Sequence, residues 1–150
     1  MKKFEANKHS LNYEKMDTLH KEFLDIYNSV DLNSKDSINS KAMELLEHTK
    51  IHFLEEEKLM DRYDYPRSRE HKEEHNKVLS ELRFFIDKSH SIFGMNILKS
   101  YFAEKLPYWF DYHLASMDSD LAAYLKNVNL KRNHSIPPTV KAVGILGELL

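Results

Sequence analysis

The sequence predicts an all-α protein, an antiparallel up-down-up-down four-helix bundle with a C-terminal tail. Apolar residues recur with a period near 3.6 in four segments, and no segment shows the sustained alternation of a β-strand. Glycine, which often marks tight turns, occurs only three times, at positions 94, 144 and 147. Four long helices joined by short loops favour antiparallel neighbours.

The first predicted helix runs from about residue 10 to residue 30. A polar stretch at 31–37, rich in Asn, Ser and Asp, predicts a loop with a new helix cap. The second helix is expected from about 38 to 62, because Tyr-Asp-Tyr-Pro at 63–66 interrupts it.

The third helix is expected to begin at Ser68, as its cap, and to end before a loop at 88–95. The fourth spans about 96–126 and contains Pro107, which predicts a bend or a later start of that helix. The helical period of its apolar residues is lost after Lys131. We therefore expect a bundle domain at 1–130, and at 131–150 a tail or a short docking segment for a protein partner.

Composition narrows the classes of function. The formal net charge of -2 does not favour nucleic acid or an anionic membrane as a partner. The absence of cysteine excludes disulfides, thiolate metal sites and thiol nucleophiles. The first residues contain no apolar stretch and no run approaches the length of a membrane span, so we expect a cytoplasmic monomer.

Histidine is unusually frequent, with nine residues in the chain. Each predicted helix places at least one histidine on its apolar stripe, and burying that many imidazoles without partners would be costly. A metal would satisfy all of them together. The candidate ligands are His20, His52, His71, His75 and His113.

Two carboxylates complete the predicted metal site. Glu56 follows His52 by four residues and shares its face, whereas Asp118 follows His113 by five and lies off the strict face. A donor set of imidazole and carboxylate suits iron, manganese or zinc. Seven ligands are too many for one ion, but they fit two ions if the carboxylates bridge them.

Three stretches of the chain resemble the motifs of the bacterial hemerythrins, a family of non-haem di-iron oxygen-binding proteins. The matching stretches are MDTLHK at 16–21, HFLEEEKLM at 52–60 followed by Tyr65-Pro66 and by HKEEH at 71–75, and WFDYHL at 109–114 followed by Asp118.

This resemblance implies reversible dioxygen binding, and not an enzyme. His71, His75 and His113 would hold one iron, while His20 and His52 would hold the other and leave a position open for dioxygen. The irons would be Fe²⁺ in the deoxy state and Fe³⁺ in the oxy and met states, with an oxo or hydroxo bridge beside the bridging carboxylates Glu56 and Asp118. The implied apolar lining of the oxygen pocket is Phe53, Trp109, Phe110 and Leu114.

Two positions depart from the family pattern. Phe110 replaces a common leucine, and His48 replaces an aromatic residue one turn before His52. His48 is either a partly exposed residue beside the site or a hydrogen-bond donor near the open iron. We expect two further groups at the surface: His9, His90 and His134, and the acidic residues Glu55, Glu57, Glu73 and Glu74.

Two other functions compete with oxygen binding. The motif His71-x-x-Glu74-His75 fits an inverted zincin, a zinc metallohydrolase with Glu74 as general base, but this leaves His20, His52 and Asp118 unexplained. A ferritin-like di-iron oxidase or iron-handling protein would need two Glu-x-x-His motifs, and no histidine here follows a glutamate by three residues.

Overall fold

The computed structural model describes residues 5–135, and these residues form helices without any strand, which confirms the predicted all-α class for this part of the chain. None of the helices in this range has the length and apolar character needed to cross a bilayer. The elements are α1 (Ala6–His9), α2 (Glu14–Asn28), α3 (Lys35–Arg62), α4 (Ser68–Asp87), α5 (Ile92–Ser100), the π-helical turn η1 (Tyr101–Lys105), α6 (Leu106–His113), the π-helical turn η2 (Leu114–Asp118) and α7 (Ser119–Ser135).

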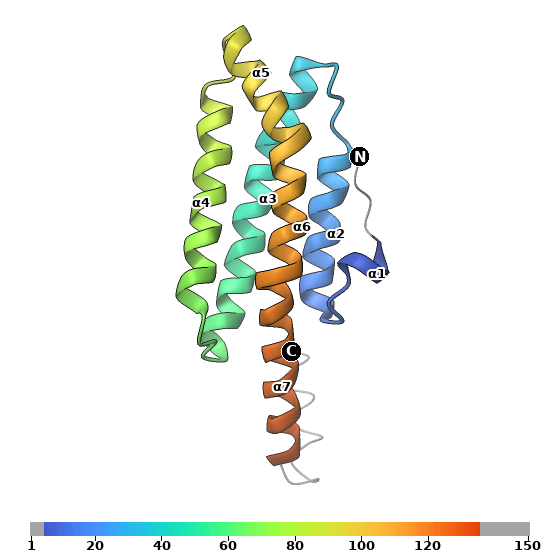
Figure 1. The fold of residues 1–150 in the computed structure, drawn as a ribbon, viewed down its shortest axis with the longest axis vertical. Helices are drawn as coiled ribbons and strands as arrows, with labels where there is room; N and C mark the ends of the chain where they lie inside the picture. Colours follow the sequence, from blue (N-terminus) through green and yellow to red (C-terminus); the bar gives the residue numbers. More distant parts are fainter. Residues whose placement is uncertain (1–4, 136–150) are drawn as a thin grey trace.

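The long helices lie side by side along the longest axis of the molecule (Figure 1). The segments from α5 to α7 follow one another as one column beside α2, α3 and α4. The loop from α2 to α3 and the loop from α3 to α4 lie at opposite ends of α3, and α7 extends past the second of these loops. The short α1 lies beside α2, outside these columns.

Helix starts follow local capping. The Ser34 hydroxyl accepts a hydrogen bond from the Ser37 N–H, so α3 begins three residues earlier than predicted. Ser68 is the first residue of α4, and Arg67 occupies the cap position, so the predicted cap at Ser68 is wrong. The hydroxyl of Ser91 caps α5 through the N–H of Gly94.

Gly94 allows a close approach of the backbone at the α4–α5 turn. A Cβ at this position would lie 1.7 Å from the carbonyl oxygen of Lys88, a distance that no side chain could occupy. The glycine therefore lets α5 begin immediately after the turn, at Ile92 rather than near residue 96 as predicted.

Pro107 lies inside a continuous helical column, so the predicted late start of this helix is wrong. The π-helical turn η1 directly precedes the α6 segment that contains the proline. Such a turn shifts the hydrogen-bond pattern, which accommodates a residue that has no N–H and whose ring would clash with the preceding turn.

The column also continues to Ser135, beyond the predicted helix end near 126 and the predicted domain boundary at 130. No glycine or proline interrupts the chain between Pro107 and Pro137, so nothing local stops the helix earlier. Of the predicted tail or docking segment at 131–150, residues 136–150 lie outside the described residues.

The core consists of two apolar clusters. One contains Phe23, Leu46 and Phe110 among its members, and the other contains Met16, Met60 and Leu121. Along α2, α3 and the α6–α7 column, buried polar residues lie in sequence between members of these two clusters: His20, His52, Glu56, His113 and Asp118. The fold therefore places a polar layer between two apolar layers.

Candidate metal centre

The buried polar layer contains two groups of residues that could each hold a metal ion. The first comprises His71, His75, His113 and Asp118, and the second comprises His20, His52 and Glu56. Within each group the candidate ligand atoms all lie within 4.8 Å of one another, and every member is buried. The structure therefore brings together all seven residues that the sequence singled out.

Helical spacing explains two of the pairs. His52 and Glu56 on α3, and His71 and His75 on α4, are four residues apart and therefore project from the same face of their helix.

His113 and Asp118 share a face because of the π-helical turn η2. In an α-helix, five residues would turn the chain by about 500°, which leaves the two side chains roughly 140° apart. The turn η2 spans Leu114–Asp118, directly after His113, and its wider i→i+5 bonding brings residues five apart into register. This places Asp118 beside His113, with 3.1 Å between His113 Nε2 and Asp118 Oδ1.

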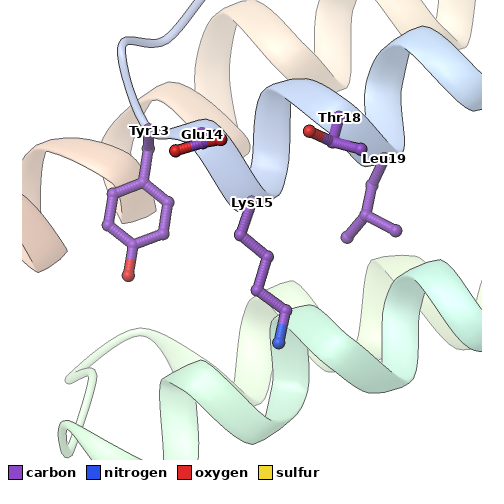
Figure 2. Close-up of a pocket in the computed structure, with 5 residues that line it drawn as sticks. All are labelled: Tyr13, Glu14, Lys15, Thr18 and Leu19. Atoms are coloured by element: carbon purple, nitrogen blue, oxygen red, sulfur yellow. The ribbon is translucent and has the colours of Figure 1, made fainter. Parts of the chain in front are cut away.

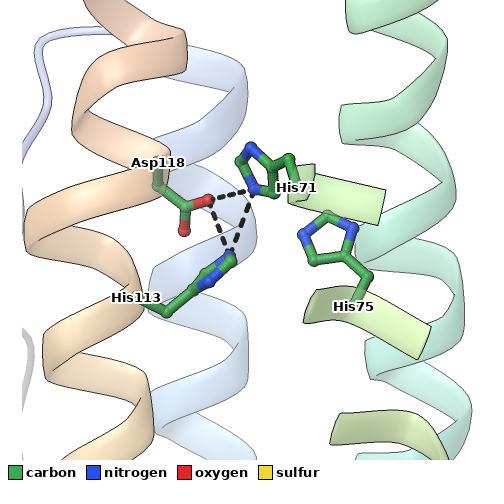
Figure 3. A group of neighbouring side chains, drawn as sticks. All are labelled: His71, His75, His113 and Asp118. Carbon is green, nitrogen blue, oxygen red and sulfur yellow. Dashed lines mark hydrogen bonds and ion pairs between the residues drawn. The ribbon is translucent and has the colours of Figure 1, made fainter. Parts of the chain in front are cut away.

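Figure 3 shows the four side chains of the first group converging from α4 and from the α6–α7 column. His71 Nε2 lies 3.0 Å from Asp118 Oδ1 and 3.2 Å from His113 Nε2. Two ligands held at right angles about 2.1 Å from one ion would be roughly 3 Å apart. These separations are therefore those of atoms that could share one ion.

The two carboxylates lie between the groups. Asp118 directs Oδ1 to the first group, and its Oδ2 lies 2.9 Å from His20 Nε2 in the second. Glu56 Oε1 lies 2.9 Å from His52 Nε2 in the second group and 3.9 Å from His75 Nε2 in the first. Each carboxylate thus faces histidines of both groups.

The pKa values of the two carboxylates shift in opposite directions. Burial raises the pKa of Glu56 well above its usual value, and the nearby Asp118 charge adds to this effect. Burial would also raise the pKa of Asp118, but its contacts with His113, His20 and His71 outweigh burial and hold the pKa well below the usual range. Burial therefore favours the protonated form of Glu56, and a metal ion bound there would compete with that proton.

For two of the imidazoles, His52 and His75, a lowered pKa favours the neutral form, which is the form that binds metals. Burial lowers the pKa of His75 to about 2, with further contributions from His71 and His113. Burial and the neighbouring His20 lower the pKa of His52 well below its usual value.

Several buried polar atoms of the two groups have no hydrogen-bond partner among the described residues. They include both nitrogens of His52, both carboxylate oxygens of Glu56 and Nε2 of His75; His52 Nε2 and Glu56 Oε1 lie 2.9 Å apart but do not form a hydrogen bond. Unpaired polar groups in a protein interior are rare and cost free energy. A positive ion held between the two groups would satisfy His52 Nε2, His75 Nε2 and the oxygens of Glu56, although not His52 Nδ1 on the far side of that ring.

Aromatic and apolar side chains cover the two groups. Phe53 stacks on His75 with ring centroids 3.7 Å apart, and Trp109 stacks on His113 at 4.6 Å. Phe110 meets His20 edge-on at 5.9 Å, and Leu114 is buried in the same apolar cluster as Phe110. Of the four residues predicted to line an oxygen pocket, Phe53, Phe110 and Leu114 are buried and Trp109 is partly buried; the three aromatic ones are in ring contact with the candidate ligands.

Two glutamates that we expected on solvated faces instead contact the site, so that expectation is wrong for them. Glu57 Oε2 lies 3.0 Å from His75 Nδ1, which orients the ring and leaves Nε2 for a metal. Glu74 Oε1 accepts a hydrogen bond of 2.9 Å from Trp109 Nε1. The sequence gave little indication of these contacts, because each glutamate lies in a run of acidic residues. Glu73, the neighbour of Glu74, is exposed as expected.

His48 lies beside the second group. Its Nε2 is 3.3 Å from the carbonyl oxygen of Leu19, to which it donates, and its ring meets His52 edge-on at 5.8 Å. His9, by contrast, is buried rather than at the surface as predicted, because α1 folds it against Phe110. His90 is exposed, as predicted, whereas the side chain of His134 is outside the described part of the structure.

A surface groove of about 530 Å³ lies away from these groups, along α2 (Figure 2). Lys15 in this groove pairs with Glu55 of α3 at 2.8 Å. None of the seven candidate ligands lines it, so it is not part of the candidate centre. The lining residues are Tyr13, Glu14, Lys15, Thr18 and Leu19.

Comparison with known proteins agrees with the motifs. The chain is 29% identical over 109 residues to a protein named bacteriohemerythrin from Ralstonia nicotianae, an alignment that covers 73% of this chain and 78% of that protein. No protein-family model matches the chain, and no solved structure matches it significantly. The resemblance to the hemerythrins is thereby confirmed: the chain is similar to a bacteriohemerythrin over about three quarters of its length.

Proposed function

We propose that this protein holds two iron ions in the two groups and binds dioxygen there reversibly. The observation that carries this proposal is the position of Asp118 and Glu56, each of which faces histidines of both groups at once. A pair of carboxylates between two clusters of imidazoles suits two neighbouring ions better than one.

The donor atoms fit iron. Neutral nitrogen and carboxylate oxygen without thiolate suit ions such as Fe²⁺ and Fe³⁺. Ions bound between the helices would satisfy the unpaired Nε2 atoms of His52 and His75 and both oxygens of Glu56. The two carboxylates would supply two negative charges, which lowers the cost of burying the ions.

The two groups would have different roles. His71, His75 and His113 would bind one iron, and His20 and His52 the other, with Glu56 and Asp118 shared. The second group has one histidine fewer, so its iron would keep a position for dioxygen. When bound, the iron pair would supply the two electrons that hold dioxygen reversibly. Phe53, Trp109, Phe110 and Leu114 would exclude water from that position.

The same proposal includes the antiparallel up-down-up-down arrangement of the four helical columns. It is supported by the alternating ends of the first two interhelical loops in Figure 1 and by the convergence of histidines from α2, α3, α4 and the α6 segment on one layer. Four-helix bundles commonly build metal sites from inward-facing side chains at such a layer.

The geometry weighs against a zinc hydrolase. Its general base would be Glu74, but the Glu74 carboxylate accepts the Trp109 hydrogen bond. That function would also leave His20, His52 and Asp118 without a role.

The proposal is tested by metal analysis and visible absorption. The purified protein should contain about two irons per chain, be nearly colourless when reduced, and gain visible absorption in air that disappears when oxygen is removed. Zinc as the sole native metal, or oxidation that oxygen removal does not reverse, would contradict it.

A substitution tests the ligand assignment separately. His113→Ala should lose the iron of the first group, whereas His90→Ala, which changes an exposed histidine, should keep both irons. An unchanged iron content in His113→Ala would refute the assignment.

A further inference from the structure

His9 is a buried histidine that the proposed iron centre does not use. It is the last residue of the short α1, and only 2% of its surface is exposed. A buried imidazole in a four-residue helix at the edge of the molecule (Figure 1) requires specific partners, because such a segment buries little apolar surface of its own.

The hydrogen bonds of His9 define its tautomer. Nδ1 accepts the backbone N–H of Glu5 at 2.9 Å, so the proton of the neutral ring is on Nε2. Nε2 lies 3.4 Å from Asp111 Oδ1 on α6, to which it donates. The same carboxylate pairs with Lys8, whose Nζ lies 3.5 Å from Oδ2. His9 thus ties α1 to the α6 segment at Asp111, the residue after Phe110.

The ring of His9 covers Phe110. The two ring centroids are 6.0 Å apart, and Phe110 in turn stacks on Phe23 at 4.6 Å with an interplanar angle of 9°. The Phe110 ring also meets His20 edge-on, at 86°. A continuous chain of ring contacts therefore runs from α1 through Phe110 to a candidate ligand of the second group.

The segment after α1 is fastened at further points. The N–H of Leu11 donates to Asp17 Oδ1 at 2.7 Å, and the carbonyl of Leu11 accepts from Lys126 Nζ at 2.8 Å. Asn12 adopts a left-handed backbone with φ of 55°, which turns the chain into α2. We call residues 5–13 the strap. Its C-terminal end is held at Leu11, independently of His9.

We propose that His9 is a positioning residue that holds Phe110 over the second group, and that the strap at 5–13 limits the passage of small molecules to that side of the centre. This inference rests on the proposed function. Without the His9 ring and its bond to Asp111, Phe110 would lose its outer support, and small ligands would enter and leave faster.

The test compares His9→Ala, His9→Gln and Lys8→Ala in the metal-loaded protein. We expect His9→Ala to speed oxygen release about fivefold, the factor expected from losing one hydrogen bond. Gln keeps much of the side-chain bulk and can donate to Asp111, so His9→Gln should recover most of the slow release. Lys8→Ala removes an exposed ion pair to the same carboxylate without touching Phe110, so it should stay near the wild type.

Two readouts do not depend on oxygen binding. Azide, a small anion that binds ferric iron, should enter the oxidised His9→Ala protein faster than the oxidised wild type. The visible absorption of the azide-bound protein follows this entry. Hydrogen–deuterium exchange should rise in peptides from residues 5–13. If the wild type fails to bind oxygen reversibly, the proposed function fails, while azide entry still decides the role of His9.

Unchanged azide entry and oxygen release in a folded His9→Ala variant would overturn the inference, as would an equal increase in Lys8→Ala. If His9→Ala does not fold, Asp111→Asn weakens the same bond without leaving a cavity. It should give a smaller increase in both rates, and unchanged rates in that variant would also overturn the inference.

Discussion

Asp118→Asn is the change that most directly tests the shared carboxylate. Asp118 contacts histidines of both groups, His71 and His113 through Oδ1 and His20 through Oδ2, at 2.9–3.1 Å. Asparagine has nearly the same shape but no charge and only one carbonyl oxygen. The substitution should therefore weaken both iron sites, whereas His113→Ala should weaken mainly one.

The magnitude follows from burial. Removing one partner of a buried charge interaction typically costs about 3–5 kcal/mol, which corresponds to roughly a hundred- to several-thousandfold loss of metal affinity. Competition with a chelator of known affinity, followed by iron analysis per chain, measures this loss at both sites.

The matched control is Asp120→Asn, two residues along the chain. The Asp120 carboxylate accepts a hydrogen bond from the Tyr65 hydroxyl and pairs with Arg67, and it belongs to neither group of candidate ligands. It should keep both irons at wild-type affinity. The shared-carboxylate reasoning is refuted if Asp118→Asn retains two irons with unchanged affinity, or if only one site is affected.

Three further predictions follow from the same geometry. Glu57→Gln should lower metal affinity by about 10- to 100-fold, because the carboxylate orients His75; chelator competition would show no change if Glu57 were only a surface group. The metal-free protein should lose stability between pH 7 and pH 5 in urea titrations. In the folded protein the pKa of His75, at about 2, and that of His52 lie below the 6.5 of the unfolded chain, so the unfolded chain binds these two protons first as the pH falls and the free energy of unfolding decreases. The raised pKa of Glu56 acts in the opposite direction, but it concerns one proton against two. Stability that does not fall towards pH 5 would contradict this. Deleting the exposed Ala115 should convert η2 into an ordinary α-turn and leave the helix intact by circular dichroism, whereas deleting Ala123 in α7 should be more destabilising; equal losses in melting temperature would argue against the π-turn explanation.

Much of the fold was readable from local signals. The period of apolar residues located the helices, and Pro66 marked the end of α3 almost to the residue. The errors lie where one backbone contact decides the boundary: Ser34 and Ser91 start their helices earlier than the apolar pattern suggests. The late helix start predicted at Pro107 was wrong because a π-helical turn, which leaves no signature in single-sequence periodicity, makes room for the proline.

For the candidate centre, the sequence by itself determined which residue types were available and which pairs shared a face. Spacings of four residues are decided within one helix, so His52 with Glu56 and His71 with His75 needed no tertiary information. Only the tertiary structure decided the rest. Asp118 reaches His113 through the turn η2 and reaches His20 across helices, and Glu57, Glu74 and His9 acquire their partners only through packing. Contacts between residues far apart in the chain depend on how whole helices pack. The periodic pattern within one helix shows which face is buried, but it does not specify the residues of the neighbouring helix that this face will contact.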